Sequence, residues 1–227
     1  TLSWNPYDSS LYAGMDEDGG AVKRNPSGNW QLLEPVRDRS IYSFLHEADD
    51  FLLMSTNLTQ SRLFGLRRGA PLHIFCNARI QCPIANRFHA MIRLPDSTLW
   101  LADDSGALLS ARLDGLDTAR PEVDYSEING QLALPFAKIN TLLLQDDASV
   151  WIGTSSSGLV RYNFAAGRVD LRLTNVGQSF PSRNVRSLHY NSAGVLWIGT
   201  TLGLTRLEPP FDSIPSKWND LSRTNSQ

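Results

Sequence analysis

Short segments in which apolar and polar residues alternate follow one another along the chain, and turn-forming residues separate them. Residues Asn184–Tyr190 alternate in this way, as a half-buried strand does. The next segment, Asn191–Gly194, is rich in residues that tolerate turn geometry, and a more apolar strand is expected over Val195–Thr200. A second turn at Thr201–Gly203 precedes a third expected strand at Leu204–Leu207. This order predicts consecutive strands joined by tight turns.

The same pattern occurs more than once, so it is a repeat. Residues Val150–Thr154 read VWIGT and residues Leu196–Thr200 read LWIGT, and a Gly-Leu-x-Arg segment follows each of them. Trp151 and Trp197 are 46 residues apart. A fourth strand is expected after the second copy, at about Ser216–Leu221. A period of roughly 40–50 residues built from short strands is typical of a β-propeller with one repeat per blade.

Weaker copies of the repeat lie upstream. The equivalent positions, spaced by 41, 47, 51 and 46 residues, are Tyr12, Leu53, Trp100, Trp151 and Trp197. Such drift is expected where insertions fall in surface loops. We therefore predict an all-β fold, a β-propeller of four-stranded antiparallel blades, with residues 1–227 forming a single propeller region of about five repeats.

The repeated motif is expected to serve packing rather than binding. A tryptophan on the second strand of a blade is a large apolar group suited to the space between neighbouring blades. The glycine that follows it lets the adjacent sheet come close. Acidic and amide pairs in the turn between the first and second strands are expected to cap that turn instead of binding metal. These pairs are Asp49-Asp50, Asp96-Ser97, Asp146-Asp147 and Asn191-Ser192.

The starts of the innermost strands are the predicted ligand site. In a propeller these starts surround the mouth of the central channel. When the repeats are aligned there, the second position varies in chemistry, yet each residue can form hydrogen bonds, which suits specific recognition. The residues at this position are Tyr42, His89, Asn140 and Arg186.

Basic residues stand just before these positions, and acidic residues are expected in loops on the same face. The basic residues predict a cationic rim suited to carboxylate, sulfate or uronate groups. They are Arg39, Arg87, Lys138 and Arg183. Asp103 and Asp104 are expected in a loop between second and third strands, as is the segment Asp16–Asp18.

Composition and charge exclude several classes of function. The net charge of −2 and the pI of about 6.1 argue against nucleic acid as a partner, because nucleic acid binding needs a basic surface. No apolar run approaches the roughly 20 residues needed to span a bilayer, so no direct membrane contact is expected of this region. Residue 1 is Thr rather than Met, which suggests a fragment of a longer protein.

Neither a metal site nor a cofactor site is expected. Cys76 and Cys82 lie six residues apart in one expected loop, where a disulfide and two free thiols are both compatible with the sequence. One nearby histidine, His73, does not complete a zinc site, which usually needs four ligands. No catalytic motif is present, so no catalytic residue is predicted. An enzyme would have to use His89 with Asp103 and Asp104.

The two best copies of the repeat resemble the two-component regulator propeller repeat. The resemblance rests on Val150–Thr154 with Gly158–Asn163, and on Leu196–Thr200 with Gly203–Arg206. It implies the periplasmic sensor region of an inner-membrane receptor, a hybrid histidine kinase or a diguanylate cyclase, whose ligand is a small molecule or an oligosaccharide. The family has no universal ligand-binding motif, so the resemblance assigns no site residue.

The number of repeats departs from this family, whose sensors usually have seven or more repeats in each propeller. We expect part of a larger propeller of about seven blades, with a closed five-bladed ring as the other option. An open array leaves blade faces and strand edges unpaired, which favours a homo-oligomer, a dimer formed through the propeller. The alternative function is a protein-interaction scaffold, which predicts an exposed apolar patch on one face instead of a polar pocket.

Overall fold

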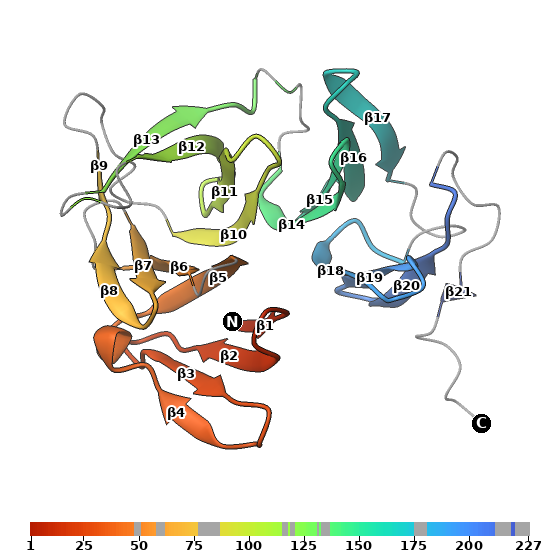
Figure 1. Ribbon diagram of the computed structural model, residues 1–227. Helices are drawn as coiled ribbons and strands as arrows, with labels where there is room; N and C mark the ends of the chain where they lie inside the picture. The colour runs from red at the N-terminus through yellow and green to blue at the C-terminus, as the bar shows by residue number, and fades with distance from the viewer. Residues whose placement is uncertain are drawn as a thin grey trace. The chain divides into compact units, whose positions relative to one another are not determined.

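The computed structural model describes residues 1–47, 51–57, 62–76, 87–114, 118, 121–130, 132, 137–174, 181–211 and 219–220. It is built from five sheets, and in each of them the four strands of one repeat pair in chain order (Figure 1). The fold is therefore the predicted all-β propeller of four-stranded blades, one blade for each repeat. A single short 3₁₀ helix, η1 (Glu34–Val36), occurs among the described residues.

Three blades come from the first part of the chain. Blade 1 is formed by β1 (Leu2–Asn5), β2 (Ser10–Gly14), β3 (Ala21–Arg24) and β4 (Trp30–Leu32). Blade 2 is formed by β5 (Ile41–Glu47), β6 (Phe51–Thr56), β7 (Leu63–Arg67) and β8 (Ala70–His73). Blade 3 is formed by β10 (Phe88–Arg93), β11 (Leu99–Asp103), β12 (Leu108–Asp114) and β13 (Glu122–Glu127), with β9 (Phe75–Cys76) added at its edge.

Two blades come from the last part of the chain. Blade 4 is formed by β14 (Ile139–Asp146), β15 (Ser149–Thr154), β16 (Leu159–Asn163) and β17 (Arg168–Leu173). Blade 5 is formed by β18 (Val185–Tyr190), β19 (Leu196–Thr200), β20 (Gly203–Leu207) and β21 (Asn219–Asp220). The four strands predicted in this last repeat are confirmed, and β21 lies within the range expected for the fourth.

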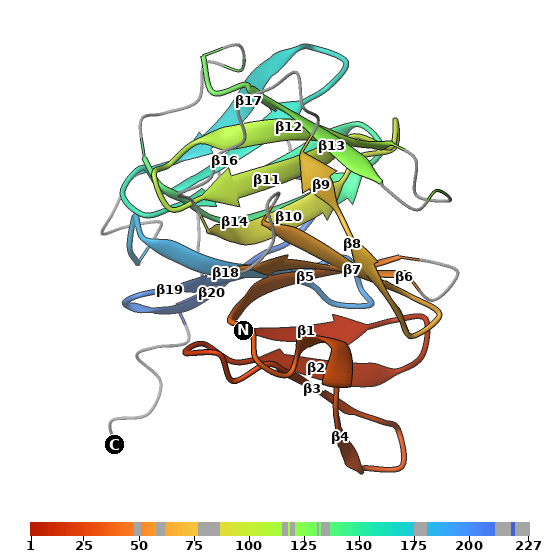
Figure 2. The same cartoon turned by 90° about the vertical axis from the view of Figure 1, so that its left-hand side faces the viewer.

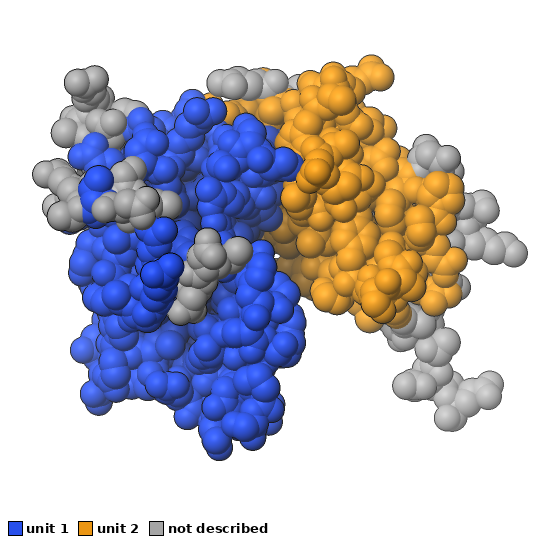
Figure 3. All heavy atoms as spheres, in the orientation of Figure 1, with its two compact units in different colours: residues 1–104, 109–126 blue, residues 105–108, 127–227 orange. Residues whose placement is uncertain are grey.

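The chain divides into two compact units, which Figure 3 shows in different colours. One unit comprises residues 1–104 and 109–126, and holds blades 1 and 2 and most of blade 3. The other comprises residues 105–108 and 127–227, and holds blades 4 and 5.

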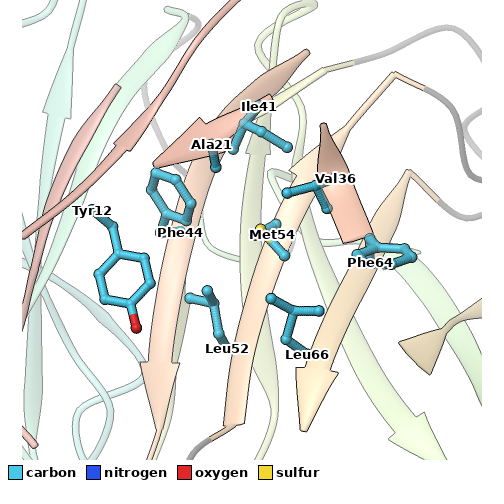
Figure 4. Packing of buried hydrophobic residues seen from close by; sticks show 9 residues of the cluster. All are labelled: Tyr12, Ala21, Val36, Ile41, Phe44, Leu52, Met54, Phe64 and Leu66. Carbon is cyan, nitrogen blue, oxygen red and sulfur yellow. The ribbon is translucent and has the colours of Figure 1, made fainter. Parts of the chain in front are cut away.

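The core of the first unit lies between blades 1 and 2, which are side by side (Figure 2). Figure 4 shows Tyr12 of β2 beside Phe44 of β5, with Leu52 and Met54 of β6 next to them. A Cβ on Gly14 would lie 2.8 Å from Ile41 of β5, so only glycine allows this approach of the two sheets.

The core of the second unit lies between blades 4 and 5. Trp151 is fully buried and packs against Val185, Leu196 and Ile198 of blade 5. A Cβ on Gly153 would lie 2.6 Å from Val185. The predicted packing roles of the tryptophan and the glycine are confirmed for this repeat.

The turns between first and second strands behave as predicted wherever they are described. The carboxylate of Asp96 accepts a hydrogen bond from the Thr98 amide, and this bond holds the pKa of Asp96 below its usual range. Asn191 accepts from the amides of Ala193 and Val195 in the same way. Asp49-Asp50 lies outside the described residues.

Blade 3 has one strand more than the repeat predicts. The chain leaving blade 2 forms β9, whose residues Phe75 and Cys76 pair in parallel with Glu122 and Val123 at the outer edge of blade 3. Cys76 therefore lies in a strand and not in the loop expected for it. Cys82 lies outside the described residues, so a disulfide and two free thiols both stay predictions from the sequence.

Candidate functional site

The starts of the inner strands share an irregularity that positions the predicted site residues. In blades 2 to 5 the pairing of first and second strands shifts register at the second residue of the inner strand. A β-bulge of this kind turns a side chain out of the regular alternation, and bulges are common beside functional sites. The residues at the bulges are Tyr42, His89, Asn140 and Arg186.

Hydrogen bonds to the flanking residues fix the start of β10. The Ser43 hydroxyl donates to the Phe88 carbonyl oxygen at 2.7 Å, and the Phe88 amide donates to the Ser55 hydroxyl at 3.1 Å. Both serines belong to blade 2, so blade 2 holds the backbone on one side of His89. His89 is the residue after Phe88, so these bonds place it beside β5.

In the first unit the structure brings several predicted residues into one cluster, the Arg87 cluster (Tyr42, Arg87, His89, Asp104 and Asp16). The Arg87 guanidinium lies over the Tyr42 ring, 4.9 Å from its centroid. Its Nε is 3.9 Å from the Asp104 carboxylate, and its Nη1 is 4.0 Å from the Asp16 carboxylate. His89 Nδ1 is 3.4 Å from Asp104 Oδ1. The cluster thus combines an aromatic ring, nitrogen donors and carboxylate acceptors.

The electrostatics of this cluster differ from the predicted cationic rim. Arg87 lies between two carboxylates, Asp16 and Asp104, which offset its charge. All three side chains are about half exposed, so these pairs are screened by water and hold the cluster only weakly.

Two predicted site residues of the first unit are partly or fully withdrawn from solvent. Asp103 is the last residue of β11 rather than part of a loop, and only 1% of its surface is exposed. Arg39 packs over the ring of Phe64, 4.4 Å from its centroid, with one guanidinium nitrogen buried. Burial lowers the pKa of Arg39. Neither carries the exposed, ligand-facing role predicted for it.

In the second unit, two of the predicted residues form hydrogen bonds within the protein, and the other two have exposed side chains. Asn140 uses its amide group to bind blade 5, donating to Asn184 Oδ1 at 3.1 Å and to the Val185 carbonyl oxygen at 2.8 Å. Arg183 donates from Nε to the Thr174 carbonyl oxygen at 2.8 Å. The side chain of Arg186 is exposed, and Lys138 is exposed just before β14.

Sequence reasoning missed a polar network next to the Arg87 cluster. The Asp18 carboxylate accepts a hydrogen bond from Asn57 at 2.8 Å, and the Asn57 carboxamide oxygen accepts from the Ser40 amide at 3.1 Å. This network ties the loop that carries Asp16 to blade 2. The acidic segment Asp16–Asp18 was the signal in the sequence, because it lies between second and third strands as Asp104 does.

Among the residues that the structure describes, no group of three or more His, Cys, Asp or Glu side chains is arranged to hold a metal ion. No helix among them is long and apolar enough to cross a membrane.

No protein-family model matches the chain, and no curated protein matches it in sequence. Solved structures do resemble it. The extracellular domain of the putative hybrid two component system BT4673 from B. thetaiotaomicron matches with a TM-score of 0.64 and 18% identity over 97% of this chain. The corresponding domain of BT3049 from the same organism matches with a TM-score of 0.64 and 15% identity over 91% of the chain. This chain covers 27% of each of them.

Propellers of other kinds are similar to a comparable degree. Virginiamycin B lyase from Staphylococcus aureus has a TM-score of 0.63 and 11% identity, over 95% of this chain and 72% of its own. At such identities the likeness shows the fold and not the activity. The chain has the propeller fold, which it shares with the extracellular domains of hybrid two-component systems and also with a lyase.

Proposed function

We propose that this chain is the ligand-sensing propeller of a bacterial transmembrane signalling receptor, of the two-component or a related type. It works in the periplasm, and its ligand is an oligosaccharide. Ligand binding changes the relative arrangement of two receptor chains, and that change crosses the membrane. The fold shared with extracellular domains of hybrid two-component systems supports this proposal.

The observation that carries the proposal is the Arg87 cluster beside the bulged residues Tyr42 and His89. A sugar ring offers hydroxyl groups that both donate and accept hydrogen bonds, together with an apolar face. Carboxylates of Asp16 and Asp104 accept, Arg87 and His89 donate, and the Tyr42 ring supplies an aromatic surface. Because the carboxylates offset Arg87, the cluster suits neutral sugars better than uronates or sulfated sugars.

A thermal-shift screen tests this function. Neutral and acidic oligosaccharides are added to the wild-type chain, to Arg87→Ala and to His89→Ala. Arg37→Ala is the matched control, because that arginine is exposed directly after η1 and pairs only loosely with Glu34, at 3.8 Å. A neutral oligosaccharide should raise the Tm of the wild type and the control, by about 2–4 °C for a gain of 1 kcal/mol in a chain of this size.

The two cluster variants should lose that rise. If they keep it in full, the ligand does not bind at the Arg87 cluster. If no oligosaccharide raises the Tm of the well-folded wild type, the sensing function is wrong for this chain.

The second candidate is an interaction scaffold without a small ligand. A specific observation favours it: the large apolar side chains of Leu2, Trp4 and Trp30 on blade 1 are exposed. An enzyme acting through His89 and Asp104 is a weaker alternative, because the Asp103 carboxylate that would complete an acid pair is buried in β11. Failure of the screen would leave the scaffold as the better reading.

A further inference from the structure

A cavity lies between blades 1 and 2, away from the Arg87 cluster. Its volume is about 330 Å³, at the lower end of the roughly 300–1,000 Å³ that is common for small-molecule sites. Both blades belong to the first unit, so the cavity lies within one compact unit. We call it the Tyr7 cavity, and its lining includes Tyr7, Asp8, Tyr12, Glu47 and Phe51.

The length of β5 separates this cavity from the Arg87 cluster. Tyr42, which belongs to the cluster, is the second residue of β5, and Glu47, which lines the cavity, is the last. Five residues of strand span about 17 Å. In Figure 4 the Tyr12 hydroxyl points away from Ile41, which begins β5. The Tyr7 cavity is therefore a separate site at the other end of the strand.

Aromatic side chains form one part of the cavity wall. Tyr12 and Phe51 are buried, whereas the side chain of Tyr7 is 62% exposed. The Tyr7 amide donates a hydrogen bond to Asn5 Oδ1 at 3.0 Å, which holds the turn that follows β1. The cavity thus combines a buried aromatic wall with one aromatic side chain that reaches solvent.

Two carboxylates form the charged part of the wall. Asp8 Oδ2 is 2.6 Å from Lys23 Nζ, and Glu47 pairs with Arg93. Neither of these cations is among the residues that line the cavity, and the lining that the structure describes contains no Lys, Arg or His. The charged groups that face the cavity are therefore negative.

One oxygen of Glu47 has no hydrogen-bond donor. Arg93 pairs with Oε2, whereas Oε1 is buried and accepts no hydrogen bond from any residue that the structure describes. Burial raises the pKa of Glu47, and Arg93 opposes this effect. A buried acceptor without a donor costs free energy, and a ligand with N–H donors recovers part of that cost. The carboxylate thus favours a cationic ligand.

We propose that the Tyr7 cavity binds a small organic amine in its ammonium form. The ammonium group donates hydrogen bonds to the carboxylates of Glu47 and Asp8, and the apolar part of the amine lies against Phe51 and Tyr7. A cation beside an aromatic ring gains a further attraction. An alcohol of the same shape binds more weakly, because it brings one donor and no charge. The proposal does not rest on the sensing function.

A matched pair of probes tests this chemistry on the full chain. Benzylammonium joins an ammonium group to one aromatic ring, and benzyl alcohol is an uncharged compound of nearly the same shape. Titrations followed by NMR should show that benzylammonium binds at least about 10-fold more tightly, the low end of the effect of a charge-assisted hydrogen bond. Its affinity should fall as the salt concentration rises.

Variants locate the site. Glu47→Gln keeps the shape of the side chain and should weaken benzylammonium about 10-fold, with little effect on benzyl alcohol. Tyr7→Ala alters an exposed side chain, so it serves if Glu47→Gln does not fold, and it should weaken benzylammonium about 2- to 5-fold. Glu34→Gln is the matched control, because it removes an exposed carboxylate of η1 outside the cavity. It should bind as the wild type does, and so should Arg87→Ala.

Three results would overturn the proposal. The first is a wild-type chain that binds no benzylammonium at any concentration. The second is equal affinity for benzyl alcohol, because the carboxylates would then contribute nothing. The third is wild-type affinity in both Glu47→Gln and Tyr7→Ala, which would place the amine elsewhere. Failure of the oligosaccharide screen changes none of these outcomes.

Discussion

Blades 4 and 5 carry nearly the same motif, yet their tryptophans lie in different environments. Trp151 is fully buried, whereas Trp197 keeps part of its surface in contact with water. The strands that hold them, β15 and β19, pair with their neighbours in the same register. The difference comes from the next sheet, because blade 5 covers Trp151. The repeat motif therefore specifies the strands of the blade. The neighbouring blade determines how much the tryptophan of the motif contributes to the stability of the fold.

The largest expected difference follows from truncating the two tryptophans. Trp151→Ala should lower the free energy of unfolding by about 3–5 kcal/mol, because it opens a cavity between two packed sheets. Trp197→Ala should cost less, about 1 kcal/mol, which is near the centre of the range for point substitutions, because this side chain is only half-buried. Urea unfolding of both variants measures the contrast. Equal losses would mean that both tryptophans are equally covered in solution.

The glycines after the tryptophans sharpen the comparison. Gly153→Ala puts a methyl group against Val185 of the next blade, which is buried and β-branched, and should cost about 1–3 kcal/mol. At Gly199 the added methyl group meets only the Ser187 hydroxyl of its own blade. Gly199→Ala should therefore be tolerated, and adding Ser187→Ala to it should remove the remaining loss of stability. Thermal melts of Gly153→Ala, Gly199→Ala and the double variant measure these losses. A larger loss in Gly199→Ala than in Gly153→Ala would contradict the expected order.

The smallest effect on stability near neutral pH is expected at His46. Its pairing with Leu52 in blade 2 corresponds to the pairing of Tyr190 with Leu196 in blade 5. Burial lowers the pKa of His46 to about 4, from an ordinary value of 6.5. The unfolded chain therefore binds a proton at a higher pH than the folded chain does. The stability that His46 contributes is present above pH 6.5 and is lost as the pH falls toward 4.

His46→Asn removes this titration while keeping a polar side chain beside Ser3. Unfolding free energies of wild type and variant between pH 7 and pH 4.5 should diverge, with the wild type losing more. Parallel curves would show that His46 titrates normally in the folded chain.

The sequence predicts the blades well because each one solves the same local problem. Alternation, turn residues and the Trp151 motif together specify four strands and the side that packs. The bulges at Tyr42 and His89 could not be predicted, since no residue type marks the position where the register shifts. The direction of Arg39 could not be predicted either, because a long side chain follows the nearest ring, here Phe64.

The extra strand of blade 3 also escaped prediction, because two residues are too short a segment for alternation to show. This strand changes the outer edge of the blade 3 sheet. In blades 1, 2 and 4 the fourth strand is the last one that the described residues pair, so its outer amides and carbonyls face no further strand. In blade 3, β9 occupies that edge at Glu122 and Val123. The edge at these residues is then that of β9, and an edge strand of two residues is a poor template for an extended peptide, so aggregation by strand addition should start at another blade.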